Sequence, residues 1–379
     1  MKKIVVLSVF GTRPEAIKMA PLIKELEKCD QIVSKVCVTA QHREMLDQVL
    51  EFFQIKPDYD LDIMEAVQTL TGITTKVLNG MSEVIGKSQP DIILVHGDTT
   101  TTFAASLSAF YHHIPIGHVE AGLRTYNKYS PFPEEINRQF TDRLATLHFA
   151  PTRTAADQLK QEFVSPQYIF TTGNTVIDAM KSTVKADYQN AILERLQPNA
   201  RLVFMTVHRR ENHGDKMENI FRAIRRSVED HKDIELVFPV HLNPIIQHAA
   251  KQFLGEHPRI HLTPPLDVID THNIISRSNL VLTDSGGIQE EAPSFGVPVL
   301  VLRDTTERPE GIEAGTLKLI GTDQHTIYQN IENLLTSPEA YQLMSTAVNP
   351  YGDGQASKRI VEAIVYYFGK GQRPNEFQN

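Results

Sequence analysis

Short apolar segments alternate with amphipathic segments along almost the whole chain, and this alternation constrains the fold more than any other feature. Segments such as Ile4–Phe10, Ile92–His96 and Ile116–Val119 have the length and composition of buried strands. Helical spacing follows, as in Thr101–His112 and in a helix from about Pro14. Strands that alternate with helices form a parallel sheet covered on both faces, so we expect an α/β fold. Further elements expected in this half are Lys35–Thr39, Arg43–Phe53, Glu134–Leu147, Leu147–Ala150 and Ile169–Thr171.

A second alternating series follows a polar stretch, so the 379 residues are expected to form two domains. Lys181–Arg201 interrupts the pattern and contains the linker. We expect Rossmann-like domains over residues 1–175 and 176–355, with a helix at about 356–379 that can pack back on the first. Two doubly wound domains that face each other would leave a cleft at the carboxyl ends of their strands. The second series comprises Leu202–Thr206, Leu236–Pro239, Ile260–Leu262, Leu280–Thr283, Val299–Leu302 and the helix Ala356–Tyr367.

The composition argues against several classes of function. The net charge is −8 and no basic run occurs, so nucleic-acid binding is not expected. No apolar stretch reaches the about 18 residues of a membrane span. Charged residues follow Ile4–Phe10 at once, unlike the cleavage region of a signal peptide. With only Cys29 and Cys37 as thiols, we expect a cytoplasmic protein.

Two polar clusters of the first half lie at predicted helix starts. Arg13 and Lys18 flank the helix after Ile4–Phe10, where cations and a helix N-terminus favour an anion. A strand-to-helix turn with surface charges has the same pattern. Glu134 opens another helix, but an acidic residue in the first helical turn is common and by itself indicates no function.

Two further clusters of this half combine histidine and a carboxylate at strand ends. Residues two apart in a strand share a face, so His96 would pair with Asp98 and His118 with Glu120. No His-Glu-x-x-His or paired-cysteine motif is present, so no metal is expected. Acid/base carboxylates in a cleft are the favoured interpretation, with hydrogen-bonded polar groups at strand ends as the alternative.

The second half contains groups that suit a phosphate-bearing ligand. His208 heads a charged cluster after a strand, although a lone histidine is more often structural. At Ser285–Gly287 a strand meets a helix, and paired glycines there let backbone N–H groups approach a phosphate. Glu291 could accept from ribose hydroxyls, and Arg308 could clamp a diphosphate. The Gly-x-Gly-x-x-Gly and Walker motifs are missing, so NAD and ATP are disfavoured and no cofactor is expected.

With these residues, the chain resembles the non-hydrolysing bacterial UDP-N-acetylglucosamine 2-epimerases along nearly its whole length. The resemblance implies the glycosyltransferase-B architecture, a UDP-sugar held between two domains, a homodimer and no dissociable redox cofactor. It also implies that Asp98, Glu120 and Glu134 are acid/base residues at the sugar and that His208 is needed for activity. Val207 departs from the Ala or Gly of many relatives. The groups that match nucleotide-binding positions are Arg13, Lys18, Ser285, Gly286, Gly287, Glu291 and Arg308. The matching segments are Phe10–Pro21, Thr39–Val49, Val95–Thr102, Gly117–Thr125, Ser130–Glu135, His208–Glu211, Leu282–Pro293, Leu302–Glu310 and Asn349–Gly354.

The chemistry of the implied reaction explains the carboxylates. The proton on carbon 2 is not alpha to a carbonyl, so simple deprotonation gives no stabilised carbanion. Expulsion of UDP from carbon 1 as that proton leaves would give 2-acetamidoglucal, and re-addition of UDP with protonation from the opposite face would invert carbon 2. The sequence leaves open which carboxylate is the base. The alternatives are a hydrolysing epimerase, a glycosyltransferase of the same fold and a non-catalytic UDP-sugar-binding regulator.

Some relatives bind a second UDP-N-acetylglucosamine that activates them, and the resemblance extends to that site. Glu44 stands where such relatives can have Gln, and Val67 where they can have Arg. Loss of an arginine would remove a bidentate diphosphate contact, so we expect weaker activation. The positions that match are Gln41, Glu134, Arg209 and His241.

Overall fold

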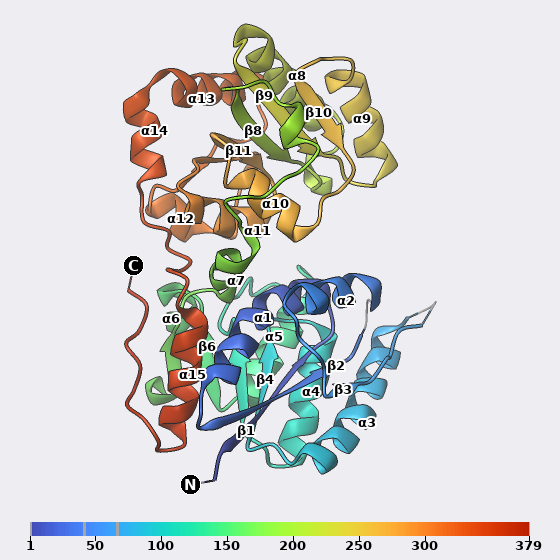
Figure 1. The fold of residues 1–379 in the computed structure, drawn as a ribbon, viewed down its shortest axis with the longest axis vertical. Coiled ribbons are helices and arrows are strands. Elements are labelled where there is room, and N and C mark those ends of the chain that lie inside the picture. Colours follow the sequence, from blue (N-terminus) through green and yellow to red (C-terminus); the bar gives the residue numbers. More distant parts are fainter. Residues whose placement is uncertain (1, 41–42, 66–67, 379) are drawn as a thin grey trace. The chain divides into compact units, whose positions relative to one another are not determined.

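The computed structural model describes residues 2–40, 43–65 and 68–378, and it divides into two compact units (Figure 1). The first unit is Met1–Ala179 together with Tyr351–Asn379, and the second is Met180–Pro350. The chain therefore leaves the first unit inside helix α7 (Thr175–Thr183) and returns after Pro350. The stretch Lys181–Arg201, which was expected to contain the linker, belongs to the second unit. No helix in the described part of the chain is long and apolar enough to cross a membrane.

The first unit is built on a seven-stranded sheet in which every pairing is parallel. Its order is β3-β2-β1-β4-β5-β6-β7, so the chain moves outward from β1 first in one direction and then in the other. This doubly wound order brings the carboxyl ends of β1, β4 and β5 to one edge of the sheet. The strands are β1 (Ile4–Phe10), β2 (Ile32–Val38), β3 (Tyr59–Asp60), β4 (Ile92–His96), β5 (Ile116–Val119), β6 (Leu147–Ala150) and β7 (Ile169–Thr171).

Helices of the first unit include two that the sequence pattern did not indicate, α3 (Leu70–Ser88) and α6 (Arg153–Gln161). Three glycines lower the helix propensity of α3, but burial of its apolar face, including Ile73, Val77 and Met81, outweighs this cost. Helix α5 ends at Leu144 instead of 147, because Leu147 already belongs to β6. The other helices are α1 (Arg13–Lys28), α2 (Arg43–Phe52), α4 (Thr100–Tyr111), α5 (Glu134–Leu144) and α15 (Ala356–Tyr367).

The final helix, α15, belongs to the first unit and packs against α1. The carboxylate of Asp178 accepts hydrogen bonds from the N–H groups of Ala356 (3.1 Å) and Ser357 (2.8 Å) at the start of α15. A carboxylate at a helix start satisfies N–H groups that have no partner within the helix. The returning chain is thereby attached to the unit that it left.

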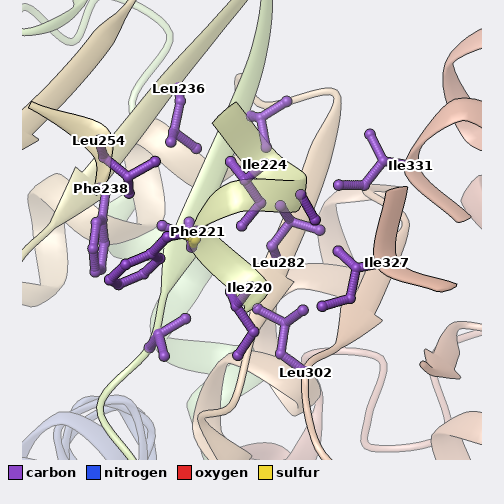
Figure 2. Packing of buried hydrophobic residues seen from close by; sticks show 14 of the residues in the cluster. Ile220, Phe221, Ile224, Leu236, Phe238, Leu254, Leu282, Leu302, Ile327 and Ile331 are labelled. Atoms are coloured by element: carbon purple, nitrogen blue, oxygen red, sulfur yellow. The ribbon is translucent and has the colours of Figure 1, made fainter. Parts of the chain in front are cut away.

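The second unit repeats the same winding on a six-stranded parallel sheet of order β10-β9-β8-β11-β12-β13. In its core, Phe221 of α8 packs beside Phe238 of β9, with ring centroids 5.6 Å apart (Figure 2). Strand β13 (Leu317–Leu319) was not expected from the sequence. The other strands are β8 (Arg201–Thr206), β9 (Ile234–Pro239), β10 (Ile260–Thr263), β11 (Leu280–Thr283) and β12 (Val299–Val301). The helices are α8 (Asp215–Asp230), α9 (Pro244–Leu254), α10 (Val268–Ile275), α11 (Gly286–Glu291), α12 (Pro309–Glu313), α13 (Gln324–Thr336) and α14 (Pro338–Ser345).

Candidate active site

Two of the three predicted carboxylates meet on one arginine of the first unit. Asp98 follows β4 and Glu120 follows β5, and the buried guanidinium of Arg138 from α5 donates hydrogen bonds to both carboxylates. The distance from Arg138 Nη2 to Glu120 Oε1 is 3.3 Å, and Arg138 Nη1 donates to the Glu120 carbonyl. Arg138 was missed in the sequence. Its signal was its place four residues after Glu134, which puts both side chains on one face of α5.

Glu120 is the most firmly held of these carboxylates. The Lys18 ammonium contacts its Oε2 atom, to which Asn174 Nδ2 also donates at 3.3 Å. Burial opposes ionisation, but the charges of Lys18 and Arg138 outweigh it and hold the pKa of Glu120 well below its usual range. The residue has a φ of 65°, a left-handed conformation that is uncommon outside glycine and is found at functional sites. Glu120 is therefore an anion at neutral pH.

The turn between β1 and α1 is tied to the turn after β4 by Glu15, which the sequence analysis did not select. Its Oε2 atom accepts from the N–H groups of Gly11 (3.1 Å) and Thr12 (2.8 Å), and its Oε1 atom accepts from Thr99 Oγ1 (2.8 Å). This capping box fixes the start of the helix that carries Arg13 and Lys18. Arg13 lies at that start, half-buried and without a hydrogen bond or ion pair to any residue that the structure describes.

The expected pairing of histidines with carboxylates along each strand is wrong, because the strands end before the carboxylates. His96 Nε2 lies 3.7 Å from Oε2 of Glu120, which follows the neighbouring strand, and burial lowers the pKa of His96 to about 3, so it is neutral. His118 contacts Asp142 and a backbone carbonyl instead of Glu120. Within residues 2–40, 43–65 and 68–378, no group of three or more His, Cys, Asp or Glu could hold a metal ion.

Glu134 is the first residue of α5, as expected, and its side chain is half-buried. It makes no hydrogen bond or ion pair within the described part of the chain, whereas the adjacent Glu135 accepts from the N–H groups of Thr125 (2.9 Å) and Tyr126 (3.0 Å). Glu135 thus anchors the preceding loop.

In the second unit, Asp284 organises the residues around His208. This fully buried carboxylate accepts from the N–H groups of His208 (2.9 Å) and Arg209 (2.8 Å) and from Asn212 Nδ2 (3.0 Å). The His208 Nδ1 atom lies 3.3 Å from Asp284 Oδ1, and the ring stacks on His241 with centroids 5.8 Å apart. Burial lowers the pKa of His208. The negative charge of Asp284 raises this pKa, whereas the charges of Arg209 and His241 lower it further, and the net shift is downward.

Two guanidinium groups gather over the glycine turn. A Cβ atom added to Gly286 would lie 3.6 Å from Arg308 Nη2 and 3.8 Å from Arg209 Nη2. Ser285 is the N-cap residue of α11, the short helix that this turn opens, so backbone N–H groups and two cations share one surface. Arg308 also contacts Glu290, and Glu291 Oε2 lies 3.3 Å from His272 Nε2. The arrangement suits a diphosphate.

The residues matched to a second, activating site are only partly described. Arg209 and His241 lie beside Gly286 and His208 respectively, as stated above. Gln41 and Val67 lie outside the described residues. The backbone of Glu44 belongs to α2, and its side chain is likewise outside what the structure describes.

Comparison with known proteins identifies the family. A family model described as UDP-N-acetylglucosamine 2-epimerase matches residues 24–365. The chain belongs to the UDP-N-acetylglucosamine 2-epimerase family. It is 58% identical to the UDP-N-acetylglucosamine 2-epimerase of Bacillus subtilis, over 100% of this chain and 99% of that protein. This confirms the resemblance that the motifs indicated, and membership of an epimerase family makes the protein an enzyme of the isomerase class.

Solved structures agree with this assignment. The UDP-GlcNAc 2-epimerase from Neisseria meningitidis, determined with UDP-GlcNAc bound, superimposes with a TM-score of 0.85 at 49% identity, over 96% of this chain and 100% of that one. The glycotransferase of kitacinnamycin shares only 11% identity but gives a TM-score of 0.64 over 97% of this chain and 99% of its own. The epimerase family member described here therefore has the glycosyltransferase-B type of fold, as expected.

Proposed function

We propose that the protein converts UDP-N-acetylglucosamine reversibly into UDP-N-acetylmannosamine by inverting carbon 2. The observation that carries the proposal is the joint anchoring of Asp98 and Glu120 on Arg138, with Glu134 four residues before that arginine on α5. Inversion needs proton-transfer groups on two faces of the sugar, and three carboxylates from different elements can supply them. The names of the family and of its relatives support the same substrate.

The proposed route is elimination and re-addition of UDP through 2-acetamidoglucal. Removal of the carbon 2 proton would accompany cleavage of the bond between carbon 1 and the bridging oxygen. Glu120 is the candidate base because it is ionised and can therefore accept a proton. Glu134 and Asp98 would then serve to return a proton to carbon 2 from the other face.

The second unit would bind and stabilise UDP as it departs. His208, Arg308 and the turn of Ser285, Gly286 and Gly287 supply cationic groups and N–H donors, which stabilise developing negative charge. Glu291 would accept hydrogen bonds from the ribose. Arg13 and Lys18 would act on the substrate from the first unit, and no cofactor takes part in this route.

The wider setting belongs to the same proposal. We infer that the protein is a cytoplasmic homodimer that binds neither nucleic acid nor membranes. Its product would serve cell-surface glycan synthesis.

Activation by a second ligand is also proposed. A second UDP-N-acetylglucosamine would activate the protein through Gln41, Glu44, Arg209 and His241. The measurement is the conversion of UDP-N-acetylmannosamine with and without a trace of UDP-N-acetylglucosamine, and equal rates would contradict activation.

Proton NMR of the purified protein with UDP-N-acetylglucosamine alone tests the function. Appearance of the anomeric signal of UDP-N-acetylmannosamine supports the proposal and argues against a transferase, because no acceptor is present. Free N-acetylmannosamine with UDP would indicate a hydrolysing epimerase. Binding without conversion would indicate a non-catalytic regulator.

A further inference from the structure

His118 and Asp142 form a buried pair close to Asp98 and Glu120. His118 bonds to the backbone of Gly97, next to Asp98, and Asp142 bonds to the backbone of Gly122, two residues after Glu120. We propose that this pair positions the two carboxylates for proton transfer, an inference that rests on the proposed epimerase function. Both are positioning residues, because they act through backbone groups and not on the sugar itself. Three features of the first unit carry the inference.

The first feature is the bond from His118 to the Asp98 turn. His118 lies in β5 with its ring fully buried, its Nδ1 atom 2.5 Å from Asp142 Oδ1 and its Nε2 atom 2.7 Å from the Gly97 carbonyl oxygen. The Gly97 carbonyl oxygen can only accept, so Nε2 is the donor in the second bond. Gly97 directly precedes Asp98 and has a φ of 66°. The second bond therefore holds the turn from which the Asp98 side chain projects.

The second feature is the bond from Asp142 to the Glu120 turn. The Oδ2 atom of Asp142 accepts from the Gly122 N–H at 3.2 Å and from Arg124 Nη2 at 2.7 Å. Gly122 has a φ of 87°, and a Cβ atom there would lie 2.3 Å from the Ala155 carbonyl oxygen. The backbone two residues after Glu120 is thus packed tightly and held by one carboxylate.

The third feature is that one helix, α5, carries both the residue that holds the two carboxylate side chains and a residue that holds their backbone. Arg138 and Asp142 are four residues apart in α5, so they project from one face. Arg138 holds the side chains of Asp98 and Glu120, and Asp142, with His118, holds their backbone. Support of this kind matters because misplacement of a reacting group by about 1 Å can cost about 10²-fold in rate.

Two substitutions separate the bonds of His118. The amide nitrogen of glutamine falls near Nε2 and that of asparagine near Nδ1, so His118→Gln keeps a donor for the Gly97 carbonyl whereas His118→Asn keeps one for Asp142. We expect His118→Asn to lower kcat at least about 10-fold. We expect His118→Gln to stay within about 3-fold of wild type, because Asp142 remains paired with Arg124 and still accepts from the Gly122 N–H. KM, and the Kd for UDP by calorimetry, should change less than about 2-fold, since a loss confined to kcat marks an interaction used in the transition state.

His148 provides the matched control. It lies opposite His118 on β6, is equally buried, and its Nε2 atom contacts the Asp142 carbonyl at 2.8 Å without bonding to either carboxylate turn. His148→Asn should therefore keep kcat within about 2-fold of wild type. His118→Asn should lose more, because it allows a positioned carboxylate to move. The melting temperature of every variant is measured, which separates a kinetic effect from loss of the fold.

Each outcome decides the inference. A folded His118→Asn with the wild-type kcat overturns it, and so does an equal loss of kcat in the glutamine and asparagine variants. If His118→Asn does not fold, His118→Gln decides alone: a folded protein that has lost more than about 10-fold in kcat overturns the inference, and a smaller loss supports it. Absence of epimerisation in the wild-type protein would contradict the proposed function instead.

Discussion

The guanidinium of Arg138 joins the carboxylates of Asp98 and Glu120, which come from turns at the ends of neighbouring strands. Both of these contacts come from Nη2, whereas Nη1 donates to the Glu120 carbonyl. A lysine has the same charge but a single nitrogen on a shorter side chain, so it cannot reproduce all three contacts. We expect Arg138→Lys to lower kcat at least about 100-fold, because general acid–base groups contribute about 10²–10⁴-fold and depend on their placement. Steady-state NMR assays measure the loss. Arg143→Lys, an exposed change on the same helix, is the control and should match wild type.

The carboxylates themselves provide the second prediction. Asp98→Asn, Glu120→Gln and Glu134→Gln each remove a proton-transfer group with little change in shape. Turnover should fall by about 10²–10⁴-fold in each variant, while thermal melting shows an intact fold. Near-normal turnover in all three, with unchanged melting, would refute their assignment.

Arg308 should contribute to binding of the nucleotide. Its guanidinium lies over Gly286, where a diphosphate would meet both the cation and the backbone N–H groups. Arg308→Ala should weaken UDP binding at least about 10-fold, since charge-assisted hydrogen bonds are worth about 1.5–3 kcal/mol. Calorimetry with UDP measures the change. Arg222→Ala, which removes an exposed arginine paired with Glu218 on α8, should leave the Kd unaltered.

Isotope labels test the proposed mechanism. In deuterium oxide the epimerised product should carry deuterium at carbon 2, because removal and return of the proton use different, exchangeable groups. Oxygen-18 placed in the bridge between carbon 1 and the β-phosphate should scramble into non-bridging positions if that phosphate rotates while bound. Long incubation should release traces of UDP and 2-acetamidoglucal.

A redox route through carbon 3 would exchange the carbon 2 proton but leave the bridge intact. Deuterium uptake without oxygen scrambling or glucal therefore argues against elimination. Epimerisation without any deuterium uptake would exclude the proposed proton transfer.

Glu307 links stability to acid pH. Burial opposes its ionisation, but the hydrogen bonds of Arg303 outweigh it and lower the pKa of Glu307 from 4.5 to about 2. The folded state therefore binds this proton less readily than the unfolded state, so the stabilisation is complete above pH 4.5 and is lost as the pH falls towards about 2. Urea unfolding should show a stability difference between wild type and Glu307→Gln that shrinks over this range. A difference independent of pH would contradict the assignment.

The amino-acid sequence by itself determined the α/β class, most strands and the positions of Asp98, Glu120 and Glu134 at element ends. These features follow from local periodicity, which needs no knowledge of distant residues. Short or unusual elements, such as β13 and the glycine-containing α3, were not predicted from the sequence. Packing against the rest of the unit stabilises them more than their own residue pattern does.

Only the tertiary structure decided which side chains meet. Alternation along the strand paired His118 with Glu120, but the strands end before the carboxylates and the backbone turns at Gly97 and Glu120, where φ is positive. Arg138, Asp142 and Asp284 are ordinary charged residues in the sequence. They become organising groups because folding buries each one against partners from other elements, and a buried charge must be hydrogen-bonded or paired.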